Sequence, residues 1–239
     1  MKAIFERAKS YYKKAQREDF KKRIKSPDFT IISNNCWGYK AYQELDIPYL
    51  TPFVGLFLPS DSFLRMIANL RFYLDQPLTF LGPSEKKVKY PVGILGGDVE
   101  IHFMHYANDG EALEKWERRK QRISKDDDRI FIKFCDHAGK HSDRLPATPE
   151  DIRTFDSMSI PYSKICFTAR PFPNLKSVFW IKECAGDKGV YDGVRLWRVC
   201  HHYADIPGWL NGGSGKLKFR HVVIKKLEIF VRKCLNIPL

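Results

Sequence analysis

The sequence lacks long apolar runs. No stretch reaches the roughly 18 uncharged apolar residues that a membrane-spanning helix needs, and the longest candidate, residues 47–60, contains three prolines. The N-terminus also lacks the apolar segment of a secretion signal. We therefore expect a chain that neither spans a membrane nor is secreted.

Cysteine is sparse and irregularly placed. The six cysteines among 239 residues form no Cys-x-x-Cys pair and no even framework, which excludes a zinc ribbon or a disulfide scaffold and indicates reduced thiols in the cytoplasm. Gly (15) and Pro (14) are at ordinary levels, and hydrophobic residues make up 44% of the chain. These values exclude fibrous and disordered classes, so a folded soluble domain is expected.

Positive charge is confined to the two ends of the chain. Residues 2–25 carry ten Lys/Arg and three Asp/Glu, residues 216–233 carry seven and one, and the body between them is neutral. A nucleic-acid-binding protein usually spreads its basic charge along the binding face. This distribution argues against a nucleic-acid partner and favours an anionic surface met by the ends.

Both ends show helical periodicity. Ile4, Ala8 and Tyr11 recur at helical spacing, as do Val223 and Leu227. We predict a basic amphipathic helix in residues 1–25 and another in 212–239. Such helices bind anionic membranes, so we expect peripheral attachment to the inner face of the cytoplasmic membrane. The alternative is that both helices pack on the domain with solvated Lys faces.

Residues 26–211 are predicted to form a single α/β domain, because strand patterns alternate with amphipathic helices. The predicted strands are 29–32, 53–58, 91–95, 99–105, 130–135, 165–168 and 178–181, and the predicted helices are 39–45, one from 60, 111–124 and one from 149. A Gly-Gly pair predicts a two-residue hairpin turn after residue 95, which makes the sheet mixed. The expected fold is a three-layer sandwich with a mixed, mostly parallel, Rossmann-like sheet.

Three polar segments follow predicted strands: residues 34–38, 105–106 and 136–137. Ligands bind beyond the carboxyl ends of strands in open α/β sheets, so we expect the site here. The candidate ligand-binding residues are Asn34, Asn35, Trp37, Gly38, Tyr106, Trp116, Arg119 and Arg122.

Cys36 lies in the first of these segments, at the start of a predicted helix. The positive end of a helix lowers a thiol pKa, which makes Cys36 a candidate nucleophile. The same free N–H groups could bind a phosphate instead, and Gly38 would allow a ligand to approach closely. The alternative is a tight turn that contains an inert, buried cysteine.

His105 and Asp136 are the candidates for acid–base chemistry. Strand alternation places His105 on the apolar face with Phe103, where burial would tune the ring. Asp136 directly follows a predicted strand and could orient a histidine, hold a metal–diphosphate or bind sugar hydroxyls. A structural histidine and a loop-capping aspartate are the alternatives. The histidine spacing fits no metal signature, so we predict no metal site in the protein.

The predicted helix 111–124 carries Arg119 on the face that Trp116 shares. An inward-facing arginine needs a partner, and a phosphate or carboxylate of a ligand suits the planar guanidinium. Arg122 would assist on the same helix, and Trp116 could stack on a ring. A structural pair of Arg119 with Asp136 or Glu100 is the alternative.

Several stretches resemble a bacterial family, the domain of unknown function 1919, whose members are often titled exopolysaccharide-biosynthesis proteins. The matching stretches are residues 31–38, 51–56, 90–93, 103–106, 111–112, the pattern within 116–123, and 209–211. The resemblance covers roughly residues 29–211 and leaves out both basic ends. It implies a role in making capsular or exopolysaccharide, with other polysaccharide-biosynthesis proteins as partners.

The leading hypothesis is therefore a glycosyltransferase-like transferase that acts on a nucleotide sugar or a nascent saccharide. His105 or Asp136 would take the proton of the acceptor hydroxyl, Arg119 and Arg122 would offset the leaving diphosphate, and residues 34–38 would cradle the donor. A nucleotide sugar could bring Mg or Mn with it.

Two alternatives remain from the sequence. The first is a cysteine-dependent hydrolase or acyltransferase that uses Cys36, His105 and Asp136 as nucleophile, base and orienting group. The second is a non-catalytic saccharide-binding module of a biosynthetic complex.

Overall fold

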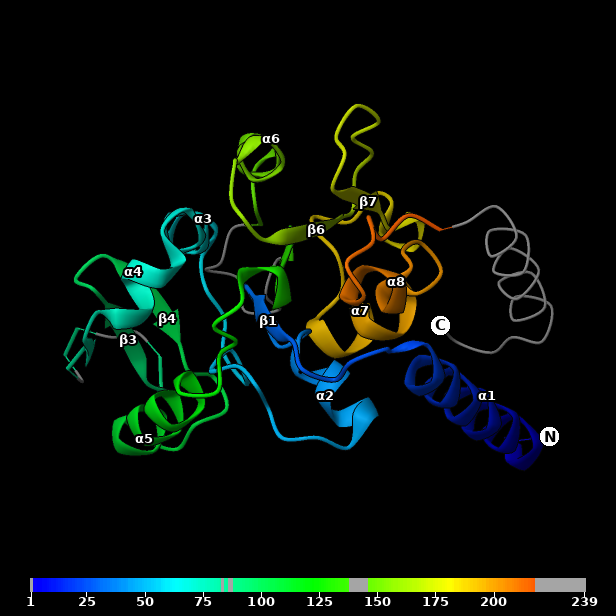
Figure 1. Ribbon diagram of the computed structural model, residues 1–239, viewed down its shortest axis with the longest axis horizontal. Helices are drawn as coiled ribbons and strands as arrows, with labels where there is room; N and C mark the ends of the chain where they lie inside the picture. The colour runs from blue at the N-terminus through cyan, green and yellow to red at the C-terminus, as the bar shows by residue number, and fades with distance from the viewer. Residues whose placement is uncertain (1, 83, 86–87, 138–145, 218–239) are drawn as a thin grey trace.

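A parallel β-sheet forms the centre of the protein, with helices on both of its faces (Figure 1). The computed structural model describes residues 2–82, 84–85, 88–137 and 146–217. Four strands lie in the order β1-β5-β6-β7, and every neighbouring pair is parallel. Their bounds are β1 Thr30–Ser33, β5 Ile130–Cys135, β6 Ser163–Thr168 and β7 Val178–Trp180. The expected α/β architecture is confirmed.

The predicted hairpin forms, but in a second sheet of its own. Strands β2 (Leu78–Phe80), β3 (Val92–Leu95) and β4 (Val99–His102) pair antiparallel in that order. The mixed character therefore comes from two separate sheets. The turn also differs from the prediction, because Leu95 pairs with Val99 and three residues connect the strands. Gly96 and Gly97 both adopt positive φ angles, 64° and 88°, which explains the two glycines.

The predicted strand 53–58 is wrong. Only Phe57 forms a bridge, to His102 of β4. The next residue, Leu58, donates its backbone N–H to the carbonyl of Asn34 at the end of β1 (2.9 Å). The segment therefore divides its backbone hydrogen bonds between the two sheets and links them.

The helices fall into two groups, one on each face of the parallel sheet (Figure 1). On the face that also carries the small sheet lie α3 (Ser60–Ala68), α4 (Leu70–Asp75), α5 (Asp109–Lys120) and α6 (Pro149–Ser157). On the other face lie α1 (Lys2–Arg23), α2 (Tyr39–Leu45), α7 (Gly193–Cys200) and α8 (Ile206–Leu210). Two short 3₁₀ helices, η1 (Asp127–Arg129) and η2 (Lys182–Cys184), complete the described elements.

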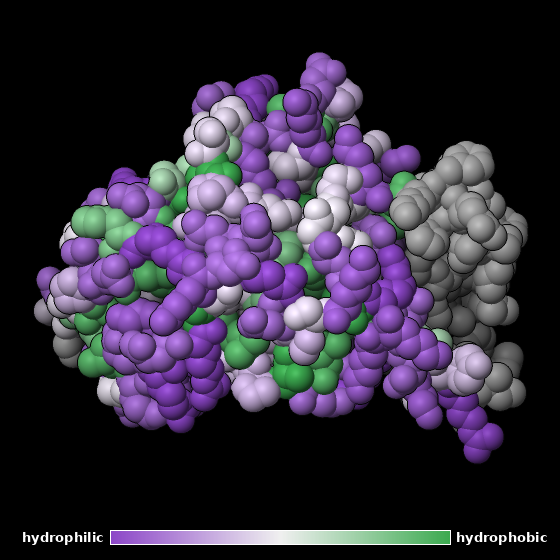
Figure 2. Space-filling view, viewed as in Figure 1, coloured by the Kyte–Doolittle hydropathy of each residue, from purple (hydrophilic) through white to green (hydrophobic). Residues whose placement is uncertain are grey.

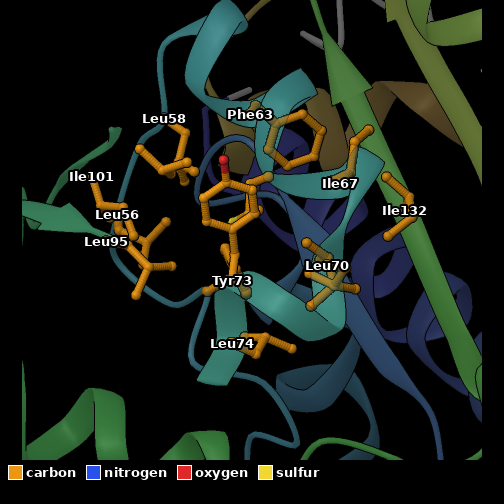
Figure 3. Packing of buried hydrophobic residues seen from close by; sticks show 14 of the residues in the cluster. Leu56, Leu58, Phe63, Ile67, Leu70, Tyr73, Leu74, Leu95, Ile101 and Ile132 are labelled. Atoms are coloured by element: carbon orange, nitrogen blue, oxygen red, sulfur yellow. The ribbon is translucent and has the colours of Figure 1, made fainter. Parts of the chain in front are cut away.

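Each face of the sheet has its own apolar core. Alternate residues of one strand serve both cores, so Ile32 of β1 faces the first and Ile31 faces the second. Figure 3 shows part of the first core, where leucines and isoleucines of α3, α4 and the small sheet surround the Tyr73 ring. The second core contains three tryptophans, Trp37, Trp197 and Trp209, whose rings pack near one another.

Helices α5, α6, α7 and α8 each begin after a polar side chain that accepts a backbone N–H of the first turn. Asn108 accepts the backbone N–H of Glu111 at the start of α5, and Thr148 forms a reciprocal capping box with Asp151 at the start of α6. Helix α3 begins at Ser60, the residue from which a helix was predicted, and Pro59 precedes it without a side-chain cap.

The N-terminal helix forms as predicted, and its C-terminal half is docked on the domain. Phe20 is 2% exposed and belongs to the second core. Arg23 forms an ion pair with Asp205, and its carbonyl accepts the side-chain amide of Asn211 (2.7 Å). The predicted C-terminal helix falls almost wholly on residues 218–239, which lie outside the described part. No helix among the described residues is long and apolar enough to cross a membrane.

Candidate functional site

The carboxyl edge of the parallel sheet holds two polar features, a buried cluster and an open cleft. The cluster follows β1 and includes Asn34 and Asn35, and the cleft follows β5 and includes Asp136. Two of the three polar segments that were predicted to bind a ligand, residues 34–38 and 136–137, therefore lie at this edge. The third selected segment, residues 105–106, follows β4 and belongs to the other sheet.

Lys133 is the centre of the buried cluster. It lies in the middle of β5, is 0% exposed, and points to the ends of two strands. Its Nζ donates to the Oδ1 atoms of Asn35 (2.8 Å) and Asn34 (3.3 Å) and to the Sγ of Cys135 (2.9 Å). A lysine amine in a protein core needs such partners, because an unpaired one is strongly unfavourable. None of these hydrogen-bond partners is a carboxylate.

This cluster turns the two asparagines inward. Asn34 also donates to the Cys135 carbonyl (3.0 Å), and the Oδ1 of Asn35 accepts the backbone N–H of Trp37 (3.1 Å). Both asparagines are at most 3% exposed. The prediction that they cradle a ligand does not match this geometry, because their polar atoms already bind Lys133 and the backbone.

Trp37 and Gly38 are structural residues of the second core. Trp37 is 0% exposed and its ring lies 4.9 Å from that of Trp197. A Cβ on Gly38 would lie 2.8 Å from Cγ2 of Ile31. Gly38 is therefore required because β1 packs closely against it, and not because a ligand approaches it. The buried Trp37 ring is not available to stack on a ligand.

Cys36 does not have the environment of a nucleophile. It is 9% exposed, its Sγ lies 3.7 Å from the carbonyl oxygen of Leu56, and burial raises its pKa to about 11, although Lys133 opposes the shift. Desolvation outweighs the helix dipole here. The structure matches the alternative reading of this segment, a tight turn with a buried cysteine.

His105 also differs from its prediction. Strand β4 ends at His102, and His105 lies exposed in the following turn, where its backbone N–H binds the carbonyl of Gly55 (3.2 Å). The alternation that predicted a buried ring stops at the strand end. Within the described residues no hydrogen bond joins Cys36, His105 and Asp136, so the three do not form a triad.

Asp136 is the predicted site residue whose environment suits chemistry. It is 5% exposed, and its two carboxylate oxygens accept the backbone N–H groups of Ala169 (2.9 Å) and Val190 (3.0 Å). Burial raises its pKa to about 6, although these two N–H groups oppose the shift. A carboxylate with this pKa is ionised at neutral pH and basic enough to accept a proton from a reacting group.

A cleft of about 250 Å³ opens beside Asp136. It lies between the carboxyl ends of β5 and β6 and the start of α6, and its lining residues are Asp136, Pro146, Ala147, Thr148, Pro149, Ile152, Arg170, Phe172 and Lys188. Two exposed cations, Arg170 and Lys188, thus share one concave surface with a buried carboxylate and the aromatic ring of Phe172. This combination suits a ligand that carries both a phosphate and a ring.

The residues predicted on and near α5 form a separate, structural group. Arg119 donates to the Tyr106 hydroxyl (2.8 Å) and lies over the Tyr49 ring (5.3 Å), and Tyr106 donates to the Val54 carbonyl (2.6 Å). Among the described residues neither Asp136 nor Glu100 pairs with Arg119. Tyr106 is 8% exposed. Arg119 and Tyr106, which were predicted to bind a ligand, therefore contact other residues of the protein instead.

Trp116 and Arg122 complete that group. Trp116 is 1% exposed in the first core and its ring packs edge-to-face on Phe53, so it does not stack on a ligand. Arg122 is exposed and its Nη1 lies 3.4 Å from the carbonyl oxygen of Tyr49. Neither lines the cleft.

Sequence reasoning missed Lys133, Arg170 and Lys188. A lysine inside the apolar run Ile130–Cys135 was a usable signal, because a strand buried on both faces rarely tolerates one. Arg170 was also marked by its position just after β6. Lys188 carries no signal of this kind. In the part of the chain that the structure describes, no group of three or more His, Cys, Asp or Glu side chains could hold a metal ion.

The fold and the cleft define a three-layer α/β protein with its candidate site at the carboxyl edge of a parallel sheet. The family model of the domain of unknown function 1919 matches residues 7–206, and the chain belongs to this family. An uncharacterised protein of Haemophilus influenzae (strain Rd) is similar, with 38% identity over 215 residues that cover 87% of this chain and 98% of that protein. The match includes most of α1, so the expectation that the family leaves out the N-terminal end is wrong.

Proposed function

We propose that the protein is a glycosyltransferase-like transferase that uses the Asp136 cleft to bind a nucleotide sugar or a nascent saccharide with its phosphate. The observation that carries this proposal is the position of Asp136, a buried carboxylate with a pKa of about 6, in one cleft with Arg170 and Lys188. The roles that the sequence assigned to Arg119 and Arg122 pass to these two cations.

The reaction follows from the cleft. Asp136 takes the proton from an acceptor hydroxyl, the acceptor oxygen forms a bond to the anomeric carbon, and the bond from that carbon to the phosphate oxygen breaks. Arg170 and Lys188 stabilise the negative charge that develops on the leaving phosphate. Phe172 offers an apolar face to a ring. A divalent ion such as Mg or Mn would bind together with a diphosphate of the donor.

The cellular setting is part of the same proposal. A saccharide acceptor on a lipid carrier fits a protein of capsular or exopolysaccharide biosynthesis that works in the cytoplasm at the inner face of the membrane. The ten basic residues within residues 2–25 support peripheral attachment to an anionic surface. Partner proteins of polysaccharide biosynthesis would meet it there.

The test is calorimetric titration with nucleotide sugars and free nucleotides, with and without Mg or Mn. We expect one nucleotide class to bind, and we expect Arg170→Ala and Lys188→Ala to weaken that binding about tenfold each. Arg153→Ala is the matched control, because Arg153 is an exposed arginine of α6 that pairs with Glu150 outside the cleft. Equal losses for Arg153 and Arg170 would reject the cleft as the site.

Asp136→Asn separates an enzyme from a binding module. In a transferase this variant keeps donor binding and loses turnover by at least about a hundredfold. Binding without any turnover in the wild type would instead favour a non-catalytic saccharide-binding module. The cysteine-dependent hydrolase receives no support from the geometry of Cys36 and His105 described above.

A further inference from the structure

A larger cavity, of about 500 Å³, lies away from the Asp136 cleft, under the C-terminal half of α1. Helices α2 and α7 form its other walls, and it shares no lining residue with the cleft. Phe20 and Trp197 contribute apolar surface, with their rings edge-to-face at 5.4 Å. The cavity therefore has an apolar floor and charged lining residues from α1, α2 and α7, and Figure 2 shows mainly hydrophilic residues around α1.

Cations outnumber carboxylates around this cavity. The charged lining residues are Lys14, Arg17, Lys21, Lys40 and Arg198, with Glu18 and Glu44 as the acids. Asp46 occupies two of these cations, since it forms ion pairs with Arg17 and with Lys21. Lys14 and Arg198 form no ion pair with any described residue, so their charge is directed to solvent or to a ligand.

Gln16 also lines the cavity, but its Nε2 is shielded from solvent, without a hydrogen-bond partner among the described residues. Lys14 and Arg198, which are exposed, are therefore the side chains that a ligand in the cavity can reach.

We propose that this cavity binds the phosphate headgroup of an anionic lipid. Phosphate oxygens would accept from Lys14 and Arg198, and the apolar floor would hold the carbon chain next to the phosphate. The N-terminal part of α1 extends from the body (Figure 1), and Tyr11 on it is 77% exposed. This inference rests on the proposed membrane association and is independent of the transferase reaction.

The first experiment measures binding of soluble dihexanoyl phosphatidic acid to the full chain by calorimetry. We expect Arg198→Ala to weaken binding about tenfold. Arg195→Ala is the matched control, because Arg195 lies on the same helix and is exposed but covers the Tyr191 ring at 3.6 Å outside the cavity. Equal losses from the two variants would show general charge attraction and overturn the site.

Vesicles then identify the source of the phosphate. We expect the protein to sediment with phosphatidylcholine vesicles that contain roughly one-fifth phosphatidylglycerol, and Arg198→Ala but not Arg195→Ala to reduce this. If Arg198→Ala sediments with the vesicles as much as the wild type does, the protein still associates with membranes, but the cavity is not the cause. No sedimentation, with equal binding of inorganic pyrophosphate and the short-chain lipid, rejects the lipid and indicates a free phosphate compound. Nucleotide-sugar titration reports on the Asp136 cleft separately in every case.

Discussion

Lys133 donates from Nζ to Oδ1 of Asn35 at 2.8 Å across the junction of β5 and the turn after β1. The same Asn35 oxygen accepts the backbone N–H of Trp37 (3.1 Å), so one amide joins the lysine to the start of the turn. The turn that sequence reasoning assigned to a ligand is thus held from within the core.

Replacing Lys133 and replacing Asn35 should lower the free energy of unfolding by different amounts. We expect Lys133→Met to lower the free energy of unfolding by about 1 kcal/mol, because it removes the buried charge and takes a donor from the Asn34 and Asn35 oxygens. Asn35→Ala should lower it by about 3 kcal/mol, because the buried amine then loses its nearest oxygen. Urea unfolding of both variants measures the difference. A larger loss for Lys133→Met than for Asn35→Ala would contradict this account.

Asp136 should make the protein less stable as pH rises. Its pKa in the folded protein, about 6, lies above the ordinary value of 3.8, so the folded state holds its proton more tightly than the unfolded state. The contribution of Asp136 to the free energy of unfolding is full below about pH 4 and falls between pH 4 and 6, by at most about 3 kcal/mol.

The comparison with Asp136→Asn isolates this contribution. The stability of the variant relative to wild type should rise between pH 4 and 6 and stay constant above pH 7. Asp46, whose pKa is lowered by the hydrogen bond from Lys21, acts in the opposite sense but is present in both proteins. Chemical unfolding at several pH values provides the measurement, and a pH-independent difference would argue against the raised pKa.

Cys36 should react slowly with iodoacetamide in the folded protein. A pKa of about 11 leaves on the order of one thiolate per 10⁴ molecules at neutral pH, and the side chain is 9% exposed. We expect alkylation at least about a hundredfold slower than in the unfolded chain, followed by peptide mass spectrometry. Rapid, selective labelling of Cys36 would restore the cysteine-dependent hydrolase as a candidate.

Gly193 is the glycine whose replacement should cost most. A Cβ there would lie 2.5 Å from the backbone nitrogen of Trp37, whereas the Gly38 Cβ would meet the side chain of Ile31 at 2.8 Å. Backbone yields less readily than a side chain, so we expect Gly193→Ala to lose more than about 3 kcal/mol and Gly38→Ala about 2 kcal/mol. Gly97→Ala, with open space around it, should cost about 1 kcal/mol from its φ of 88°. Thermal unfolding of the three variants measures these losses of stability. A different order of the losses would contradict the contacts described for these glycines.

Local signals predicted most of the elements. The strand Ile130–Cys135 was predicted to the residue because a run that is apolar except for Lys133 precedes an aspartate, and the start of α6 followed from Thr148 and Pro149. The segment 53–58 was mistaken for a strand because its composition suits a sheet. Its hydrogen bonds, to β4 and to Asn34, depend on partners that the sequence pattern does not identify.

The candidate site was predicted only in part, for a physical reason. Asp136 was found because a strand end has a sequence signature, but Arg170 and Lys188 join it through β6 and a loop that the strand order brings to the same edge. Residue type and spacing alone could not decide whether Asn34, Cys36 and Arg119 face a ligand or the protein interior. The positions of Lys133, Leu56 and Tyr106 decide it, and they are set by tertiary packing.

The attachment of α1 has a consequence for synthesis on the ribosome. Arg23 and its ion-pair partner Asp205 are 182 residues apart, and Asn211 lies still later in the chain. At a synthesis rate of roughly 5–20 residues per second, the segment that binds Arg23 is made on the order of 10–40 s after α1. During that interval Arg23 has no Asp205 to pair with. If α1 meets an anionic surface as proposed above, that contact therefore precedes completion of the fold.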